Sequence, residues 1–158
     1  MTAAKDRVRL WLRLLKVVRG VETELRDKLR RDHNTTLPRF DVMSALSRHP
    51  DGLKMSELSG VLRVSNGNVT GIADRLGEEG LVERIAVPGD RRATRLRLTP
   101  TGQAEFESQA AAHEAWIDGM LSGISAEEAR AIVERLQIFA QAAETPSQTT
   151  MKDTADAQ

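Results

Sequence analysis

The segment from Met55 to Gly102 constrains the fold more than any other part of the chain, because its hydrophobic pattern changes from helical period to strand period and back. Its first half carries a narrow apolar stripe at helical spacing, formed by Val69, Ile72, Ala73 and Leu76. Its second half alternates arginine with leucine from Thr94 to Leu98, as a half-buried strand does. This order predicts helices followed by a β-hairpin.

A helix–turn–helix is predicted at the start of this segment. The first helix spans about Ser56 to Leu62, and Arg63-Val64 form the short turn. The second helix is expected to begin at Ser65, whose hydroxyl can cap the first turn, and to end at Gly80, a residue suited to the C′ position. Its face opposite the apolar stripe contains Gly67, Asn68, Thr70, Gly71, Asp74 and Arg75. Each glycine costs a helix roughly 1 kcal/mol against alanine, so we expect a partner to approach this face closely.

A β-hairpin is predicted next, with strands at Leu81–Val87 and Thr94–Leu98. Between the strands, proline and glycine supply a turn, and Arg91 and Arg92 are expected at the tip of the hairpin, outside both strands, where they have no core to join. A helix–turn–helix followed by such a hairpin forms a winged helix.

The rest of the chain is predicted to be helical apart from one short strand at Leu53–Met55. The expected helices are about Lys5–Arg31, Pro38–Arg48, Pro100–Leu121, and one that follows the capping box Ser125–Glu128 and carries the apolar stripe Ala129–Ala143. The fold class is therefore mainly α with a small β wing. We expect four regions: a dimerisation helix (1–36), a winged helix-turn-helix lobe (37–99), two further dimerisation helices (100–144) and a disordered tail (145–158). A homodimer is expected because one chain cannot cover all these apolar faces.

Charge is distributed unevenly, although the net charge is zero. Residues 1–40 contain 11 Lys and Arg against 5 Asp and Glu, whereas residues 100–158 contain 3 against 10. Such asymmetry favours an acidic ligand for the basic part. The first helix carries six cations on its polar side, and they either form an ordinary solvated surface or hold phosphates: Lys5, Arg7, Arg9, Arg13, Lys16 and Arg19.

The residue types needed for catalysis are not found together. His33, His49 and His113 are far apart in the sequence, without carboxylates at metal-ligand spacing. The chain has no cysteine, which excludes disulfides. The N-terminus has no signal-peptide pattern and no run of ~18 apolar residues occurs. We therefore expect a cytoplasmic protein that is not an enzyme and has no cofactor or metal.

The wing segment resembles the signature of the MarR family of bacterial regulators, Asp-x-Arg, apolar residues, then Leu-Thr-x-x-Gly. The matching positions are Asp90, Arg92, Leu98, Thr99 and Gly102. Upstream, Leu37–Met43 resembles the second helix of the family, and the resemblance covers roughly Leu10 to Ala143. It implies a dimeric regulator that binds duplex DNA through the second helix and the wing. Without cysteine, a thiol switch of the kind some members use is excluded.

This reading gives specific roles to residues of the second helix and the wing. Asn68, Thr70 and Arg75 would meet base edges in the major groove, and Gly67 and Gly71 would let the helix seat deeply. Ser65 and Asn66 would hold a phosphate at the helix N-terminus. By resemblance, Asp90 would orient Arg92, and Arg91 and Arg92 would enter the minor groove. The alternative is a winged-helix module that binds a protein partner through the same face without reading DNA.

The resemblance also implies a small effector. MarR proteins commonly bind aromatic acids or phenolics between the dimerisation helices and the winged-helix lobe. Here that cavity would be lined by Trp11, Leu14, Val18, Phe40, Met43, His113 and Trp116. The helix–turn–helix segment is also similar to a subgroup that regulates hydroxycinnamate breakdown, in which some members sense the CoA thioester. The phosphates of a thioester would then use Arg9, Arg13 and Lys16. We expect the DNA-bound form to be a repressor and the ligand to release it.

Overall fold

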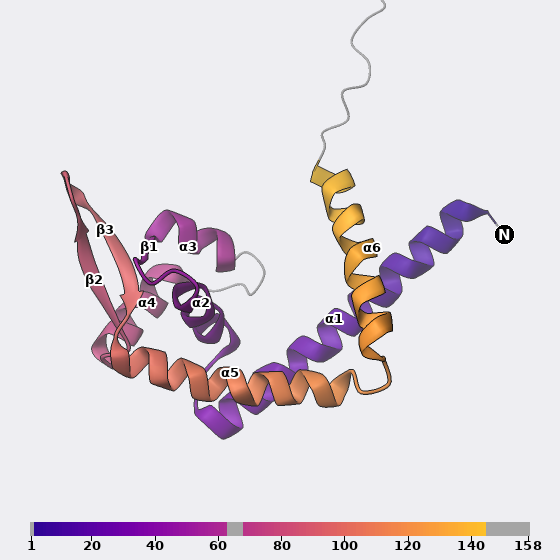
Figure 1. Cartoon of the computed structure of the whole chain (residues 1–158), viewed down its shortest axis with the longest axis horizontal. Helices are drawn as coiled ribbons and strands as arrows, with labels where there is room; N and C mark the ends of the chain where they lie inside the picture. The colour runs from indigo at the N-terminus through magenta and orange to yellow at the C-terminus, as the bar shows by residue number, and fades with distance from the viewer. Residues whose placement is uncertain (1, 63–67, 145–158) are drawn as a thin grey trace, which may run out of the picture. The chain divides into compact units, whose positions relative to one another are not determined.

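The computed structural model describes residues 2–62 and 68–144, and the chain divides into two units, Met1–Met120 and Leu121–Gln158 (Figure 1). The first unit contains α1 (Ala3–His33), α2 (Leu37–Ser47), β1 (Leu53–Lys54), α3 (Met55–Leu62), α4 (Val69–Glu78), β2 (Val82–Val87), β3 (Asp90–Leu98) and α5 (Pro100–Met120). The second contains α6 (Ala126–Glu144). The predicted fold class, mainly helical with a small wing, is confirmed. The predicted disordered tail lies outside the described residues.

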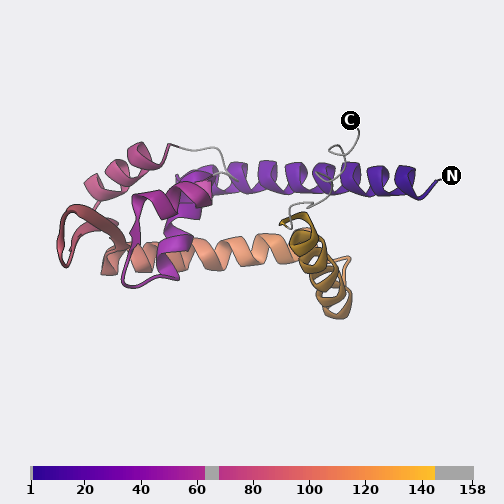
Figure 2. The ribbon, with the colours of Figure 1, turned by 90° about the horizontal axis from the view of Figure 1, so that it is seen from above.

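The wing is a three-stranded antiparallel sheet in the order β1-β3-β2. Leu53 of β1 pairs with Leu96, and Val82 of β2 pairs with Leu98, so the short third strand expected from the sequence is present. Leu96 is buried, which directs one face of the sheet toward the core. Figure 2 shows the wing and α4 at one end of the first unit and the N-terminal half of α1 at the other end.

Two hydrophobic clusters meet at α2. One joins α2 to α3, α4 and the wing through buried residues that include Met43, Leu58 and Leu76. The other joins α2 to α1 and α5, and its buried members are Leu25, Leu29, Leu37 and Phe40. Helix α2 therefore connects the winged-helix lobe to the α1–α5 pair.

Several helix ends follow from local sequence. Gly80 has φ +72, and after the C-cap Glu79 the N–H groups of Gly80 and Leu81 donate to the carbonyls of Gly77 and Leu76, which is a Schellman motif. Before α6, the backbone N–H of Ser125 donates to Glu128 at 2.8 Å and that of Glu128 donates to Ser125 Oγ at 3.2 Å. Both the C′ glycine and the capping box were predicted, and both are confirmed.

The start of α4 differs from the expectation. The helix begins at Val69, and its N-cap is Asn68, whose Oδ1 accepts the Gly71 N–H at 3.2 Å. Serine and asparagine are comparable caps, so the sequence alone did not discriminate between them. The predicted cap Ser65 and its neighbours Asn66 and Gly67 lie outside the described residues.

Candidate nucleic-acid interface

Helix α4 presents a polar face opposite its buried side. Ala73 and Leu76 are buried, whereas Asn68, Thr70 and Arg75 are exposed, as the periodicity predicted. Gly71 is half-buried, and a Cβ added to it would touch the Asn68 side chain at 3.5 Å, an ordinary contact. Close seating of a partner is therefore a better reason for glycine at this position than crowding within the chain.

Asn68 is the N-cap of α4, in addition to being predicted to contact a base. Its Oδ1 accepts the Gly71 N–H, so a bidentate pair with adenine would use an oxygen that already caps the helix. The side-chain amide N–H groups are not used by this cap. One side chain can serve both purposes, because a carbonyl oxygen has two lone pairs.

We expect Asn68→Asp to separate the two roles. Aspartate caps as well as asparagine and suits the positive end of the helix dipole, so stability should stay near that of the natural chain. Asn68→Ala should lose about 1 kcal/mol of stability. Both variants should lose ~1–3 kcal/mol of affinity for a preferred duplex and much less for random DNA. Urea denaturation and fluorescence anisotropy measure the two effects, and undiminished binding by Asn68→Asp would restrict Asn68 to capping.

The wing arginines lie on β3 and not in a loop, which corrects the expectation. The turn consists of Pro88 and Gly89, with φ +83 at Gly89, and β3 begins at Asp90. The strand register shifts here, because Ala86 pairs with Thr94 while Val87 pairs with Asp90. Residues 91–93 therefore form a bulge, a device that redirects side chains. Arg91 and Arg92 are both exposed on it.

Asp90 shapes this bulge through the backbone. Its Oδ1 accepts the backbone N–H of Arg92 at 3.0 Å, an Asx-type turn. This bond is made to the main chain of Arg92, and the predicted orienting role of Asp90 toward the arginine side chain stays a prediction.

Two ion pairs around α4 were not found from the sequence. Arg84 of β2 donates to Asp74 at 2.7 Å, which neutralises an acid on the exposed face of α4. Arg39 of α2 forms a bidentate pair with Glu79 at the C-cap of α4. Their partners are 10 and 40 residues apart in the sequence, so no local pattern indicates them.

The predicted effector residues fall into separate places. Phe40 stacks on His113 with ring centroids 4.8 Å apart, and Trp116 packs against the same buried cluster. Met43 lies in the other cluster, with 0% exposure. Trp11 and Val18 are exposed on α1 and Leu14 is half-buried. Trp116 contacts Lys28, which is about 25 Å from Trp11 along α1 at 1.5 Å per residue. Arg9, Arg13 and Lys16 are exposed on the same N-terminal half of α1.

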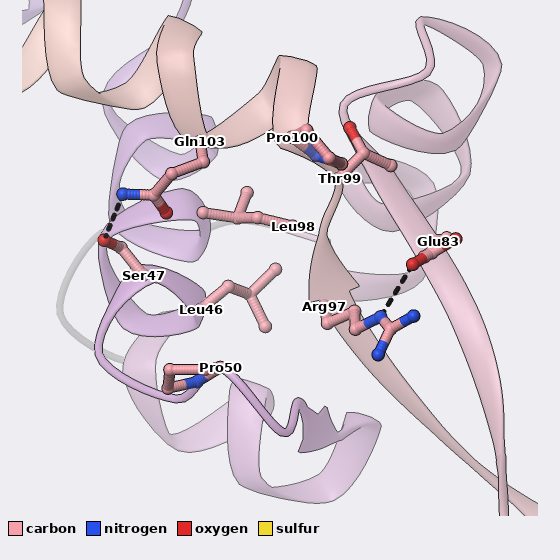
Figure 3. Close-up of a pocket in the computed structure, with 9 residues that line it drawn as sticks. All are labelled: Leu46, Ser47, Pro50, Glu83, Arg97, Leu98, Thr99, Pro100 and Gln103. Carbon is pink, nitrogen blue, oxygen red and sulfur yellow. Dashed lines mark hydrogen bonds and ion pairs between the residues drawn. The ribbon is translucent and has the colours of Figure 1, made fainter.

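A pocket of about 500 Å³ lies at the root of the wing (Figure 3). It is an open pocket, lined by the C-terminal end of α2 and the loop after it, the paired ends of β2 and β3, and the first turn of α5. Leu46, Leu98 and two prolines make its apolar part, while Arg97 donates to Glu83 at 2.6 Å on one side. None of the residues predicted to contact an effector lines this pocket.

The half-buried ring of His113 makes stability depend on pH. Burial lowers the pKa of His113, and the charge of Asp41 partly opposes this shift. The unfolded chain therefore binds a proton more readily, so stability should fall as the pH falls through the ordinary histidine pKa of ~6.5 and stop falling below the folded-state pKa. His113→Phe should flatten this dependence in urea denaturation at pH 7.5, 6.5 and 5.5. An unchanged slope in that variant would assign the effect to other groups.

The described residues contain no group of three or more histidine and acidic side chains placed to hold a metal ion. In the same part of the chain, no helix is long and apolar enough to cross a membrane. The arrangement of the exposed polar helix α4 packed on α3 and followed by a basic wing is that of a winged-helix DNA-binding protein.

Comparison with known proteins gives the same class. The model of the MarR family matches residues 35–94. The HTH-type transcriptional repressor MdtR of Bacillus subtilis (strain 168) is 31% identical over 141 residues, which cover 89% of this chain and 90% of the relative. A MarR family transcriptional regulator from Silicibacter pomeroyi superimposes with a TM-score of 0.75 at 29% identity, covering 91% of this chain and 99% of that one. Streptococcus pneumoniae FabT, solved in complex with DNA, gives 0.69 at 25% identity, covering 88% and 98%.

The chain belongs to the MarR family. It is a DNA-binding transcriptional regulator, and membership of this family of regulators excludes the enzyme hypothesis.

Proposed function

We propose that this chain is a homodimeric repressor that binds a pseudo-palindromic operator and is released from it by a small ligand. The observation that carries this proposal is the joint exposure of the polar face of α4 and of the wing arginines on one winged-helix lobe. The printed name of the relative MdtR, a repressor, and the DNA complex of FabT support it. The direct contacts would be those named above: Asn68, Thr70, Gly71, Arg75, Arg91 and Arg92, with Ser65, Asn66 and Gly67 at the start of the helix.

Exposed apolar residues support the dimer. On α1 they include Val8, Leu10, Trp11 and Leu12, each more than 50% exposed, and on α6 they include Ile138 and Phe139, at 60% and 62%. Patches of this kind mark protein contacts. Regions 1–36 and 100–144 would then form the dimerisation lobe around two winged-helix lobes, each comprising residues 37–99. Two recognition helices related by a twofold axis would meet half-sites about 10 bp apart.

The effector would be an aromatic acid or its CoA thioester, as the resemblance to the hydroxycinnamate subgroup implies. His113 and Trp116, both half-buried, offer aromatic surface beside the buried Phe40, and Arg9, Arg13 and Lys16 offer exposed cations for phosphates. A ligand that prefers the unbound arrangement by ~1–3 kcal/mol would lower operator affinity about 5- to 150-fold.

Selection from a randomised duplex library, followed by a salt titration of the enriched duplex, tests the DNA-binding proposal. We expect a palindromic consensus and a steep log–log salt slope. A chain that enriches no sequence, or binds without salt dependence, would instead be a module for protein contacts. Analytical ultracentrifugation at micromolar concentration tests the dimer, which a monomeric mass would contradict.

Calorimetry with free aromatic acids and their CoA thioesters tests the effector. Neutralising Arg9, Arg13 and Lys16 together should weaken thioester binding and leave the DNA affinity of the unliganded protein nearly unchanged. Equal thioester affinity in the triple variant would remove these residues from the ligand site, and a loss of DNA affinity would make them phosphate contacts.

A further inference from the structure

The recognition helix α4 is attached to the core by a narrow apolar contact. Among the ten described residues of α4, the buried ones are Ala73 and Leu76, with Val69 and Ile72 half-buried beside them. A stripe this narrow leaves polar contacts to help fix the tilt of α4, among them the Arg84–Asp74 pair described above. Contacts at the helix ends therefore matter for the angle at which α4 meets a partner.

Arg39 of α2 provides such a contact at the C-terminal end of α4. Its Nη1 donates to Glu79 Oε1 at 3.0 Å, and its Nη2 donates to Glu79 Oε2, so the pair is bidentate. The Arg39 side chain is 16% exposed, and its Nε is buried without a hydrogen-bond partner in the described part of the chain. The guanidinium is thus held between the protein interior and the Glu79 carboxylate, whose side chain is 48% exposed, so the bidentate geometry and not burial of both charges distinguishes this pair.

The position of Glu79 also points to this contact. A negative charge at the C-cap of a helix opposes the helix dipole, which favours cations there. Glu79 is therefore unfavourable for α4 alone and becomes favourable through Arg39.

Phe40, the next residue of α2, makes a connection to different elements. Its ring stacks on His113 at 4.8 Å and meets Phe106 at 5.6 Å, both on α5. It also belongs to the buried cluster that contains Leu25 and Leu29 of α1. Arg39 and Phe40 are consecutive residues of α2. Through them, one turn of α2 contacts both the recognition helix α4 and the α1–α5 pair.

We propose that Arg39 is a positioning residue for sequence-specific DNA binding, and that it transfers the placement of the α1–α5 pair to α4 through the Arg39–Phe40 turn. This inference rests on the proposed function. In this proposal Arg39 acts through Glu79, whose two carboxylate oxygens accept from its two terminal nitrogens, and it makes no direct contact with DNA.

The test uses Arg39→Gln in the full chain with two probes: the duplex that the natural chain enriches from a randomised library, and a scrambled duplex of the same composition. Affinity for the enriched duplex should fall about 3- to 30-fold, the range for residues that couple without contacting a ligand. Affinity for the scrambled duplex should change less than about twofold, and the salt slope should stay the same, because no phosphate contact is lost.

Matched variants separate positioning from general effects. Glu79→Gln should reproduce the loss, and the double variant should lose no more than either single one, because both break the same contact. Arg39→Lys keeps the charge but not the bidentate fork, so it should give an intermediate loss. Arg26→Gln breaks a surface pair with Glu22 at 3.1 Å on α1 and should change neither affinity.

Each outcome decides the proposal. Natural affinity of Arg39→Gln for both duplexes overturns it, and so does an equal loss on both duplexes with a flatter salt slope, which would make Arg39 a phosphate contact. If circular dichroism shows that Arg39→Gln does not fold, Arg39→Lys and Glu79→Gln carry the same comparison. A natural chain that enriches no duplex contradicts the proposed function itself, a result distinct from any effect of Arg39.

Discussion

Gly102→Ala is expected to destabilise the first unit more than alanine at any other glycine that the structure describes in this unit. A Cβ at residue 102 would lie 1.8 Å from the carbonyl oxygen of Leu81 and 2.8 Å from its carbonyl carbon. Both are backbone atoms and cannot rotate away. Thr99 also donates its N–H to this oxygen at 3.0 Å. The residue before β2 and the residue before α5 are therefore hydrogen-bonded to each other at this point. We expect a loss of about 3 kcal/mol, at the upper end for overpacking.

Thermal and urea denaturation measure this loss, which corresponds to about 6–12 °C in Tm for a chain of this size. Gly119→Ala is the matched control in the same helix, because a Cβ there would meet nothing within 4 Å. That variant should gain up to about 1 kcal/mol from the better helix propensity of alanine. Natural stability in Gly102→Ala would mean that α5 does not approach Leu81 so closely.

Arg92→Ala is expected to weaken DNA binding by roughly 100-fold or more in a dimer, since hydrogen bonds to charged groups contribute about 1.5–3 kcal/mol each and each subunit would lose one. The arginine is exposed on the bulge of β3, so stability should change little. The slope of log affinity against log salt should flatten by about one per lost contact per subunit.

Anisotropy titrations at several salt concentrations give both quantities. Arg30→Ala, at an exposed position of α1 away from the wing, is the control and should leave affinity and slope near their natural values. If Arg92→Ala bound with the natural slope, Arg92 would not contact the phosphates or the minor groove, and any wing contact would have to come from Arg91.

Local chemistry explains what could be predicted from the sequence. The C′ glycine at residue 80 and the Ser125–Glu128 box are formed by hydrogen bonds between residues three to five apart, so the local sequence is enough to specify them. The order of helices and wing follows equally from hydrophobic periodicity. The family motif identified the wing for the same reason, because its residues are contiguous.

The tertiary structure decided two kinds of feature: the choice between comparable local caps, and the contacts between distant segments. Ser65 and Asn68 are comparable caps by residue type. In the folded chain the N-cap of α4 is Asn68, whose Oδ1 accepts the Gly71 N–H. The bulge at residues 91–93 arises from the register of β3 against β2, which the sequence of β3 does not contain. Gly102 lies against Leu81, 21 residues away in the sequence, and Arg39 binds Glu79, 40 residues away. Both contacts are set by how the strands and helices pack, and no short sequence pattern indicates them.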